Sequence, residues 1–156
     1  SEQARNPMAH KPAQSGPHAE VIGTCLSTFS TTSFQFQQRW WKTAEHAFQW
    51  CKTTDKIWAD RIADSKTPAE AKKWGNLAPL RPDWEDIKEA VMLEVLRSKY
   101  RDDRIARDFL LVTEDLPIVE SAKYDSYWGT GAKGTGRNRL GKLLELVRSE
   151  LRETFG

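Results

Sequence analysis

The sequence has 156 residues, enough for one globular domain that buries its own core. Its 24 basic and 22 acidic residues leave a net charge of +2, which argues against a protein that holds nucleic acid by bulk charge alone. Two cysteines, Cys25 and Cys51, and the lack of a leader-like segment indicate free thiols in a reducing compartment, the cytosol or the nucleus. The longest apolar stretches span only a few residues, so we expect no membrane partner.

The beginning of the chain predicts an arm followed by a small sheet. Residues 1–20 are polar and rich in proline, with no apolar period, so they bury too little surface to offset chain entropy. We expect them to form a disordered arm ahead of a single domain over 21–156. Residues 21–25 and 34–36 are short β-prone pieces, and the second alternates apolar and polar side chains.

Helix signals follow from Thr43 onward. Thr43 precedes an apolar-periodic stretch that predicts a helix to about Asp55, and residues 57–63 continue in helical composition. The run at 67–70 supplies a threonine cap, a first-turn proline and a glutamate that completes a capping box. Gly75 is the expected end of this short helix.

The second half of the chain predicts more helices and one short strand. Asp83 is expected to cap the longest helix, whose buried stripe comprises Ile87, Val91, Val95 and Leu96. A further helix is expected over about 103–112, and a short strand over 117–120. A glycine-rich loop then leads to a last helix over about 139–154, with one apolar face formed by Leu140, Leu143, Leu144, Val147 and Leu151.

The predicted fold class is mainly α, a single domain of several helices around a small, minor β-sheet. No internal repeat and no regular alternation of strand and helix occurs, which argues against a dinucleotide-binding fold. The chain also contains seven Trp, most of them beside charged or turn residues. These indoles either cover core edges with their N–H reaching water or offer one or two stacking surfaces for a purine.

The stretch 43–52 carries the most chemistry. On a helix Glu45, Gln49 and Lys52 fall at i, i+4 and i+7, so a carboxylate, an amide and an amine share one face. That face is either solvated surface or the lining of a pocket. The neighbouring His46 lacks a second His or Cys at ligand spacing, so we expect no metal site.

A carboxylate and an amine on one face suit cleavage of a glycosidic C–N bond. The carboxylate can stabilise an oxocarbenium-like C1 or shuttle a proton to the leaving nitrogen. The amine of Lys52 can act as a cation for phosphate. It can also attack a ring-opened ribose aldehyde to form a Schiff base, provided that burial lowers its pKa. The spacing does not choose between these roles.

The glycine-rich segment 128–139 is a second candidate site. Its glycines free backbone N–H groups ahead of a helix, as in an anion cradle, and positive charge comes from Lys133, Arg137 and Arg139. The alternative is a flexible connection with solvated cations. Asp125 adds a second carboxylate just before an aromatic pair, although by itself it is typical of a turn.

Taken in order, these pieces resemble the NADAR (YbiA-like) family from about Leu26 to the C-terminus. The blocks that carry the resemblance are Leu26-Ser27-Thr28-Phe29, Glu45-His46-Ala47-Phe48-Gln49 with Lys52, Thr67-Pro68-Ala69-Glu70-Ala71-Lys72, Arg81-Pro82-Asp83-Trp84, Asp125-Ser126-Tyr127-Trp128-Gly129 and Gly136-Arg137-Asn138-Arg139-Leu140-Gly141. Their order and compatible spacing make the resemblance specific. Two positions depart from the family pattern: Thr28 replaces an Asn, so it keeps a hydroxyl but loses an amide, and Lys42 replaces a Pro.

The resemblance implies a mainly α fold and an N-glycosidase that uses no cofactor, neither metal nor redox group. Two substrate classes are associated with such proteins, phosphoribosylamino-pyrimidine intermediates of riboflavin synthesis and ADP-ribose attached to guanine in DNA or RNA. We favour the second, because abundant Trp suits a purine platform. The expected partner is therefore a molecule that contains ADP-ribose or ribose phosphate. A non-catalytic ADP-ribose-binding module and an interaction domain stay open as other function classes.

The resemblance also assigns roles to individual residues. Glu45 is expected to be the catalytic carboxylate and Lys52 the amine that contacts or attacks the ribose, with help from Asp125. Trp84 and Trp128 would stack on the base or wall it. Further substrate contacts are expected from Thr28, Phe29, His46, Gln49, Arg81, Tyr127, Gly129, Arg137 and Asn138, of which Arg81, Arg137 and Asn138 would hold phosphate or ribose hydroxyls.

Overall fold

The structure, a computed structural model, describes residues 16–155, so most of the expected arm lies outside the described residues. The first element is β1 (Ala19–Glu20), which lies within the segment expected to be disordered and pairs in parallel with β4 (Ile118–Val119). The strand expected over 21–25 is wrong, because the chain turns there. Gly23 adopts a φ of +75°, and the hydroxyl of Thr24 donates a hydrogen bond back to the Val21 carbonyl over 2.9 Å.

A second pair of strands is antiparallel and joins β2 (Phe34–Phe36) to β3 (Arg39–Trp41). The strand predicted at 34–36 is confirmed, whereas β3 was not expected. The connecting residues Gln37 and Gln38 both have positive φ values, 52° and 63°, a turn conformation that Gln does not signal in a sequence. The small sheet is thus two separate two-stranded sheets within the described part of the chain.

Three helices follow in the first half of the chain: α1 (Ala44–Trp50), α2 (Lys56–Ala63) and α3 (Pro68–Leu77). Thr43 caps α1 by accepting a hydrogen bond from the His46 N–H over 3.1 Å. The first helix ends short of Asp55, whose carboxylate instead caps α2. The third helix does not end at the expected Gly75 but continues to Leu77, and this glycine packs against the side chain of Gln49 in α1.

Three more helices complete the fold: α4 (Trp84–Asp102), α5 (Arg104–Val112) and α6 (Arg139–Phe155). Asp83 precedes α4 but makes no capping hydrogen bond, because its carboxylate is paired with Arg81 over 2.7 Å. Asp103 caps α5 through the Ala106 N–H, and its second oxygen accepts a hydrogen bond from Thr32 over 2.6 Å. The apolar face predicted for α6 is buried along its length.

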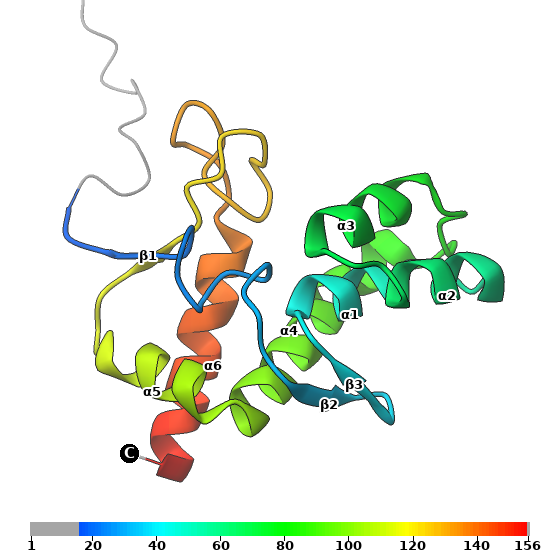
Figure 1. The fold of residues 1–156 in the computed structure, drawn as a ribbon. Coiled ribbons are helices and arrows are strands. Elements are labelled where there is room, and N and C mark those ends of the chain that lie inside the picture. The colour runs from blue at the N-terminus through cyan, green and yellow to red at the C-terminus, as the bar shows by residue number, and fades with distance from the viewer. Residues whose placement is uncertain (1–15, 156) are drawn as a thin grey trace, which may run out of the picture.

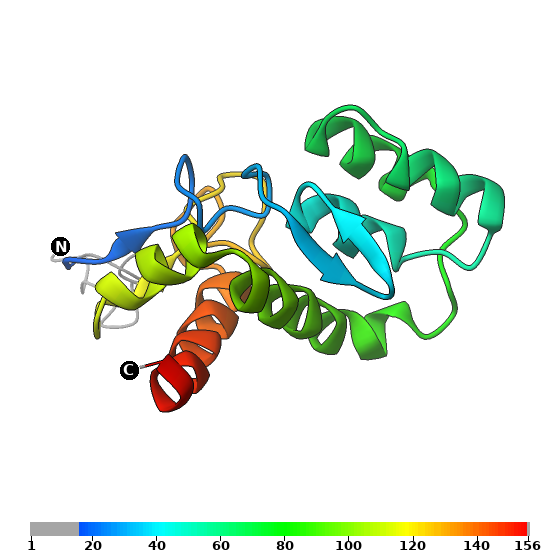
Figure 2. The ribbon, with the colours of Figure 1, turned by 60° about the horizontal axis from the view of Figure 1, so that its bottom comes forward.

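The helix α4 runs along both halves of the molecule (Figures 1 and 2). On one side of it lie α1, α2 and α3, and on the other lie β1, α5, α6 and the loop that precedes α6. Two clusters of buried apolar side chains correspond to this division, one around β2, β3 and α1 and the larger one around α4, α5 and α6. The mainly α fold class is therefore confirmed.

Candidate active site

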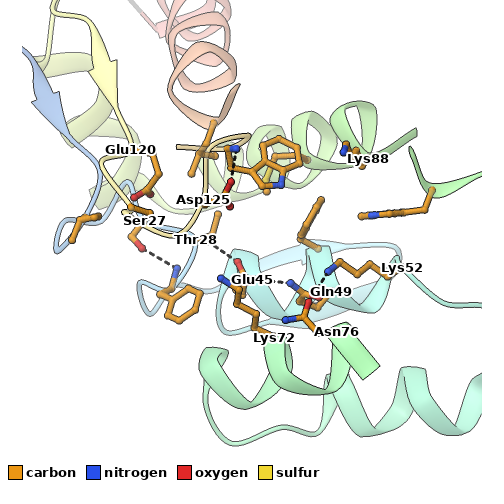
Figure 3. A pocket seen from close by; sticks show the side chains of 18 of the residues that line it. Ser27, Thr28, Glu45, Gln49, Lys52, Lys72, Asn76, Lys88, Glu120 and Asp125 are labelled. Carbon is orange, nitrogen blue, oxygen red and sulfur yellow. Dashed lines mark hydrogen bonds between the residues drawn. The ribbon is translucent and has the colours of Figure 1, made fainter. Parts of the chain in front are cut away.

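A cavity of about 570 Å³ lies between the two sides of the molecule (Figure 3), in the size range of small-molecule sites, roughly 300–1,000 Å³. One wall comes from α1 and α3, a second from α4, a third from the segments around β4 and the loop before α6, and a fourth from residues 22–29. The polar side chains of the lining are Ser27, Thr28, Glu45, Gln49, Lys52, Lys72, Asn76, Glu85, Lys88, Glu120 and Asp125. The apolar or aromatic side chains are Ile22, Phe29, Phe48, Trp84, Met92, Ala122, Trp128 and Leu140.

Glu45 is the most constrained carboxylate in this cavity. Its side chain is 6% exposed, although no positive charge is paired with it among the described ion pairs. The Thr28 hydroxyl donates to Oε2 over 2.7 Å, and the Gln49 amide nitrogen donates to Oε1 over 2.8 Å. The Glu45 backbone N–H also donates to the Thr28 carbonyl over 2.9 Å. Both carboxylate oxygens are thereby fixed in orientation.

Lys52 lies on the same face of the chain, one turn beyond Gln49, and its amine donates to Asn76 Oδ1 over 3.3 Å. Burial lowers the pKa of this amine, and Lys72 lowers it further, while Glu45 acts in the opposite direction. The three side chains that share one face at i, i+4 and i+7 thus all line the cavity. A lysine whose pKa is lowered by burial has the property that a nucleophilic amine requires.

Two further lysines of the lining were missed from the sequence, Lys72 on α3 and Lys88 on α4. The Lys72 amine lies 5.9 Å from the Phe29 ring centroid, and the Lys88 amine lies 3.9 Å from that of Tyr127 and pairs with Glu85 over 2.6 Å. The only sequence signal for Lys72 was its position at the end of the 67–72 block. With Lys52 they give the cavity three amines, a set of donors suited to phosphate groups.

The apolar wall of the cavity is aromatic. Phe48 packs against Trp84 with ring centroids 5.1 Å apart and against Trp128 at 5.5 Å, edge to face. Trp84 is 4% exposed, so most of its surface is used in the core. Trp128 is half-buried and therefore keeps the larger free surface for a planar ligand.

The third wall carries two carboxylates, Asp125 and Glu120. Asp125 Oδ1 accepts hydrogen bonds from the backbone N–H groups of Tyr127 and Trp128, at 2.9 and 2.8 Å, which fixes the turn. Glu120, which no sequence pattern singled out, is 9% exposed. Burial raises its pKa to about 7. A glutamate directly after a short strand does not indicate from the sequence that its side chain is buried in a cavity wall.

Several residues that the sequence assigned to substrate do not line the cavity. His46 is buried, with its Nδ1 2.7 Å from Thr43 Oγ1 and its Nε2 2.9 Å from the Ser65 carbonyl oxygen. It therefore joins α1 to the end of α2. The Arg81 guanidinium points to Asp83 and is bound by both of its oxygens.

Of the assigned residues in and beside the glycine-rich segment, Trp128 lines the cavity, whereas Tyr127, Gly129, Arg137 and Asn138 do not. The Tyr127 hydroxyl donates to Glu89, and the Arg137 guanidinium lies 5.5 Å from the Tyr127 ring centroid, beside a separate groove lined by the loop. Gly129 and Asn138 are buried. The Asn138 amide is used at both ends, donating to the Ile118 carbonyl over 2.8 Å and accepting from the Glu120 N–H over 2.9 Å. The Asn138 amide thus contacts backbone groups of the protein itself.

Within residues 16–155, no group of three or more His, Cys, Asp or Glu side chains is arranged to hold a metal ion. Over the same residues, no helix combines the length and apolar character needed to cross a membrane.

The chain is similar to known proteins in both sequence and structure. N-glycosidase YbiA of Escherichia coli (strain K12) is 37% identical to this chain over 128 residues, which are 81% of this chain and 80% of that protein. The NMR structure of the E. coli protein YbiA has a TM-score of 0.77 and 36% sequence identity, over 83% of this chain and 79% of that one. An N-glycosidase of Nostoc punctiforme is 37% identical over 133 residues, 82% of this chain and 85% of that protein.

A riboflavin biosynthesis protein of Vibrio vulnificus is also similar, with 31% identity over 135 residues. These residues are 82% of this chain but only 35% of that longer protein. The profile of the NADAR domain matches residues 17–152, which include every residue of the cavity lining. The family resemblance is thus confirmed by a family profile, by sequence relatives and by a solved structure, and the chain belongs to the NADAR family.

Proposed function

We propose that the protein is an N-glycosidase that hydrolyses the bond between C1 of an ADP-ribose unit and guanine in nucleic acid. The observation that supports this most strongly is Glu45, a buried carboxylate with both oxygens fixed by donors, which shares a cavity with the half-buried amine of Lys52. The names of the YbiA and Nostoc relatives support the reaction class.

Glu45 suits the reacting carbon. C1 of the ribose gains positive charge as its bond to nitrogen breaks, so the transition state is oxocarbenium-like. A carboxylate that Thr28 and Gln49 hold in one orientation offers fixed negative charge without having to reorganise during the reaction. Lys52, one turn further along and bonded to Asn76, would then contact the ribose or attack its aldehyde form.

The remaining lining suits the rest of ADP-ribose. The amines of Lys72 and Lys88 would face the diphosphate, and the free surface of Trp128 would stack on a base. The exposed Phe29 at the Lys72 side would cover a second planar group. Asp125 would assist by orienting a ribose hydroxyl through the oxygen that the turn leaves free.

A phosphoribosylamino-pyrimidine intermediate of riboflavin synthesis is the second candidate substrate. The name of the Vibrio vulnificus relative favours it. The same carboxylate and the same amines would serve a ribose with a single phosphate, so the reaction class is unchanged.

The experiment that tests the proposal is incubation with guanine-ADP-ribosylated DNA, with release of free ADP-ribose followed by mass spectrometry. Release by the wild type is expected, and Glu45→Gln is expected to lower the rate by about 100-fold or more while ADP-ribose binding in calorimetry persists. Lys52→Ala should also be slow. The matched controls are Glu94→Gln and Lys56→Ala, exposed residues of the same types outside the cavity, which should keep the wild-type rate.

Cleavage of the riboflavin intermediate, with none of the modified DNA, would move the proposal to the second substrate. Binding of ADP-ribose without any product would instead identify a binding module. Full activity of Glu45→Gln would contradict the role of this carboxylate.

A further inference from the structure

Glu120 lies across the cavity from α1, at the end of β4 (Figure 3). Resting on the glycosidase proposed above, we propose that Glu120 is the general acid of the reaction and gives its proton to the departing nitrogen. Glu45 and Glu120 would then divide the work, the first as a fixed anion at C1 and the second as a proton donor to the leaving group.

The backbone of Glu120 is held on both sides. Its N–H donates to Asn138 Oδ1 over 2.9 Å, and its carbonyl accepts from the Thr130 N–H over 2.8 Å. Asn138 is itself tied to the Ile118 carbonyl two residues earlier. The position of Glu120 is therefore set by the loop before α6 as well as by β4. Asn138 is a positioning residue, because it acts on the reaction only by holding Glu120.

The close approach of Gly129 adds a second constraint. A Cβ atom at position 129 would lie 2.6 Å from the Glu120 carbonyl oxygen and 3.1 Å from its Cγ. Any side chain there would push Glu120 out of its place. The buried glycine and the buried asparagine of the family blocks thus both bear on the position of Glu120.

The surroundings of Glu120 favour its protonated form. Burial raises the pKa of Glu120 to about 7, whereas a hydrogen bond from the backbone N–H of Ala122 lowers it. The carboxylates of Glu20 on β1 and Asp125 on the following turn raise it further, and the amine of Lys72 across the cavity lowers it. A carboxyl group that titrates near neutrality is suited to both giving and regaining a proton.

Asp125 is less suited to this step. Its Oδ1 accepts two backbone hydrogen bonds, which require an acceptor there and fix the turn before Trp128. The Glu120 carboxyl meets one backbone N–H, that of Ala122, whereas Asp125 Oδ1 accepts from two. The acid role thus falls to Glu120, which lines the cavity across from α1 and whose burial favours the protonated form.

The proposed step balances without any other reactant than water. The bond between C1 and nitrogen breaks, its electron pair stays on nitrogen, and the Glu120 proton joins that nitrogen. The oxygen of water then bonds to C1, and the proton that this water loses returns to Glu120. The products are the free base or amine and the ribose with a hydroxyl at C1.

The first test is the pH profile of kcat/KM on the substrate that the wild type cleaves. The kcat/KM of the wild type should fall as the pH rises above about 7, which forms an alkaline limb of the profile. Glu120→Gln should lack this alkaline limb, and its kcat/KM should be lower by about 100-fold or more. Glu20→Gln is the matched control, because it removes a negative charge beside Glu120 and leaves the acid in place. It should keep the limb and move it to lower pH.

The second test needs no activity. Carboxyl carbons of glutamate in ¹³C-labelled protein are titrated by NMR, and the resonance missing from Glu120→Gln identifies Glu120. Titration near pH 7 supports the inference, whereas titration at an ordinary glutamate pKa overturns it even if cleavage of the glycosidic bond is established. A Glu120→Gln variant with wild-type rate and an unchanged limb overturns it as well. No cleavage by the wild type of either substrate class is a different result, which overturns the proposed function itself.

Discussion

The side chain of Gln49 on α1 packs directly on Gly75 of α3. A Cβ atom at position 75 would lie 2.8 Å from Gln49 Cδ and would therefore overlap the Gln49 amide. The same amide donates to Glu45. We expect Gly75→Ala to displace the amide and to lower kcat by about tenfold or more, the value of a hydrogen bond to a charged group. Helix propensity favours Ala by about 1 kcal/mol and overpacking costs about 1–3 kcal/mol, so the loss of stability should be modest.

Steady-state kinetics and thermal unfolding of the same Gly75→Ala preparation measure the two effects. Lys73→Ala on the exposed side of α3 is the control and should change neither. A Gly75→Ala enzyme with the wild-type kcat would show that the Gln49 amide does not orient Glu45.

Thr28 supplies the second donor to Glu45, over 2.7 Å. Thr28→Val keeps the shape and removes the hydroxyl, so one carboxylate oxygen loses its partner. We expect kcat to fall by roughly 10- to 100-fold, because a hydrogen bond to a charged group contributes about 1.5–3 kcal/mol, with little change in KM. Thr28→Ser retains the donor and should stay close to wild type. Equal rates for the Val and Ser variants would contradict this role.

The amine of Lys52 can be tested as a nucleophile, because burial lowers its pKa. We expect incubation with ADP-ribose and cyanoborohydride to reduce a Schiff base and to leave a stable adduct on the peptide that contains Lys52. Lys56, exposed and outside the cavity, serves as the internal control for random modification. Cleavage without any adduct on Lys52 would favour its role as a cation for phosphate.

Glu120 should make stability depend on pH in a definite direction. Its pKa is raised from 4.5 to about 7 in the fold, so the folded protein binds more protons than the unfolded chain between these values. Its contribution is fully present below pH 4.5 and is lost as the pH rises through 7, by at most roughly 3 kcal/mol. Urea unfolding at several pH values should show this loss in the wild type relative to Glu120→Gln. Parallel profiles for the two proteins would contradict the raised pKa.

The helices could largely be predicted because their signals are local. Thr43, Thr67 and Asp103 cap their helices with their own side chains, and the apolar period of α6 is sufficient to define its buried face. The glutamate, amide and amine at i, i+4 and i+7 likewise follow from the geometry of the chain around α1. Whether that face was solvated or enclosed depended on α3 and α4, which no local pattern specifies.

The features that escaped prediction depend on contacts between distant segments. A glycine such as Gly75 is typical of a helix end, yet this one lies within α3, where a side chain would clash with Gln49 of α1. His46 lies next to Glu45 in the sequence, but adjacent residues on a helix point to different sides, and His46 turns to Ser65. The chemistry of Glu120 arises from burial and from Glu20, a residue that β1 brings beside it.

The parallel pairing of β1 with β4 joins Ala19 to Ile118 across most of the domain, through strands of only two residues. Contacts so far apart in sequence cost loop-closure entropy, and so short a pair opens at low free energy. The wall with Glu120 should therefore exchange its amide hydrogens sooner than the core of α4, with the Val21 N–H, bonded to Val119, as the reporter. Substrate that contacts both walls should slow this exchange.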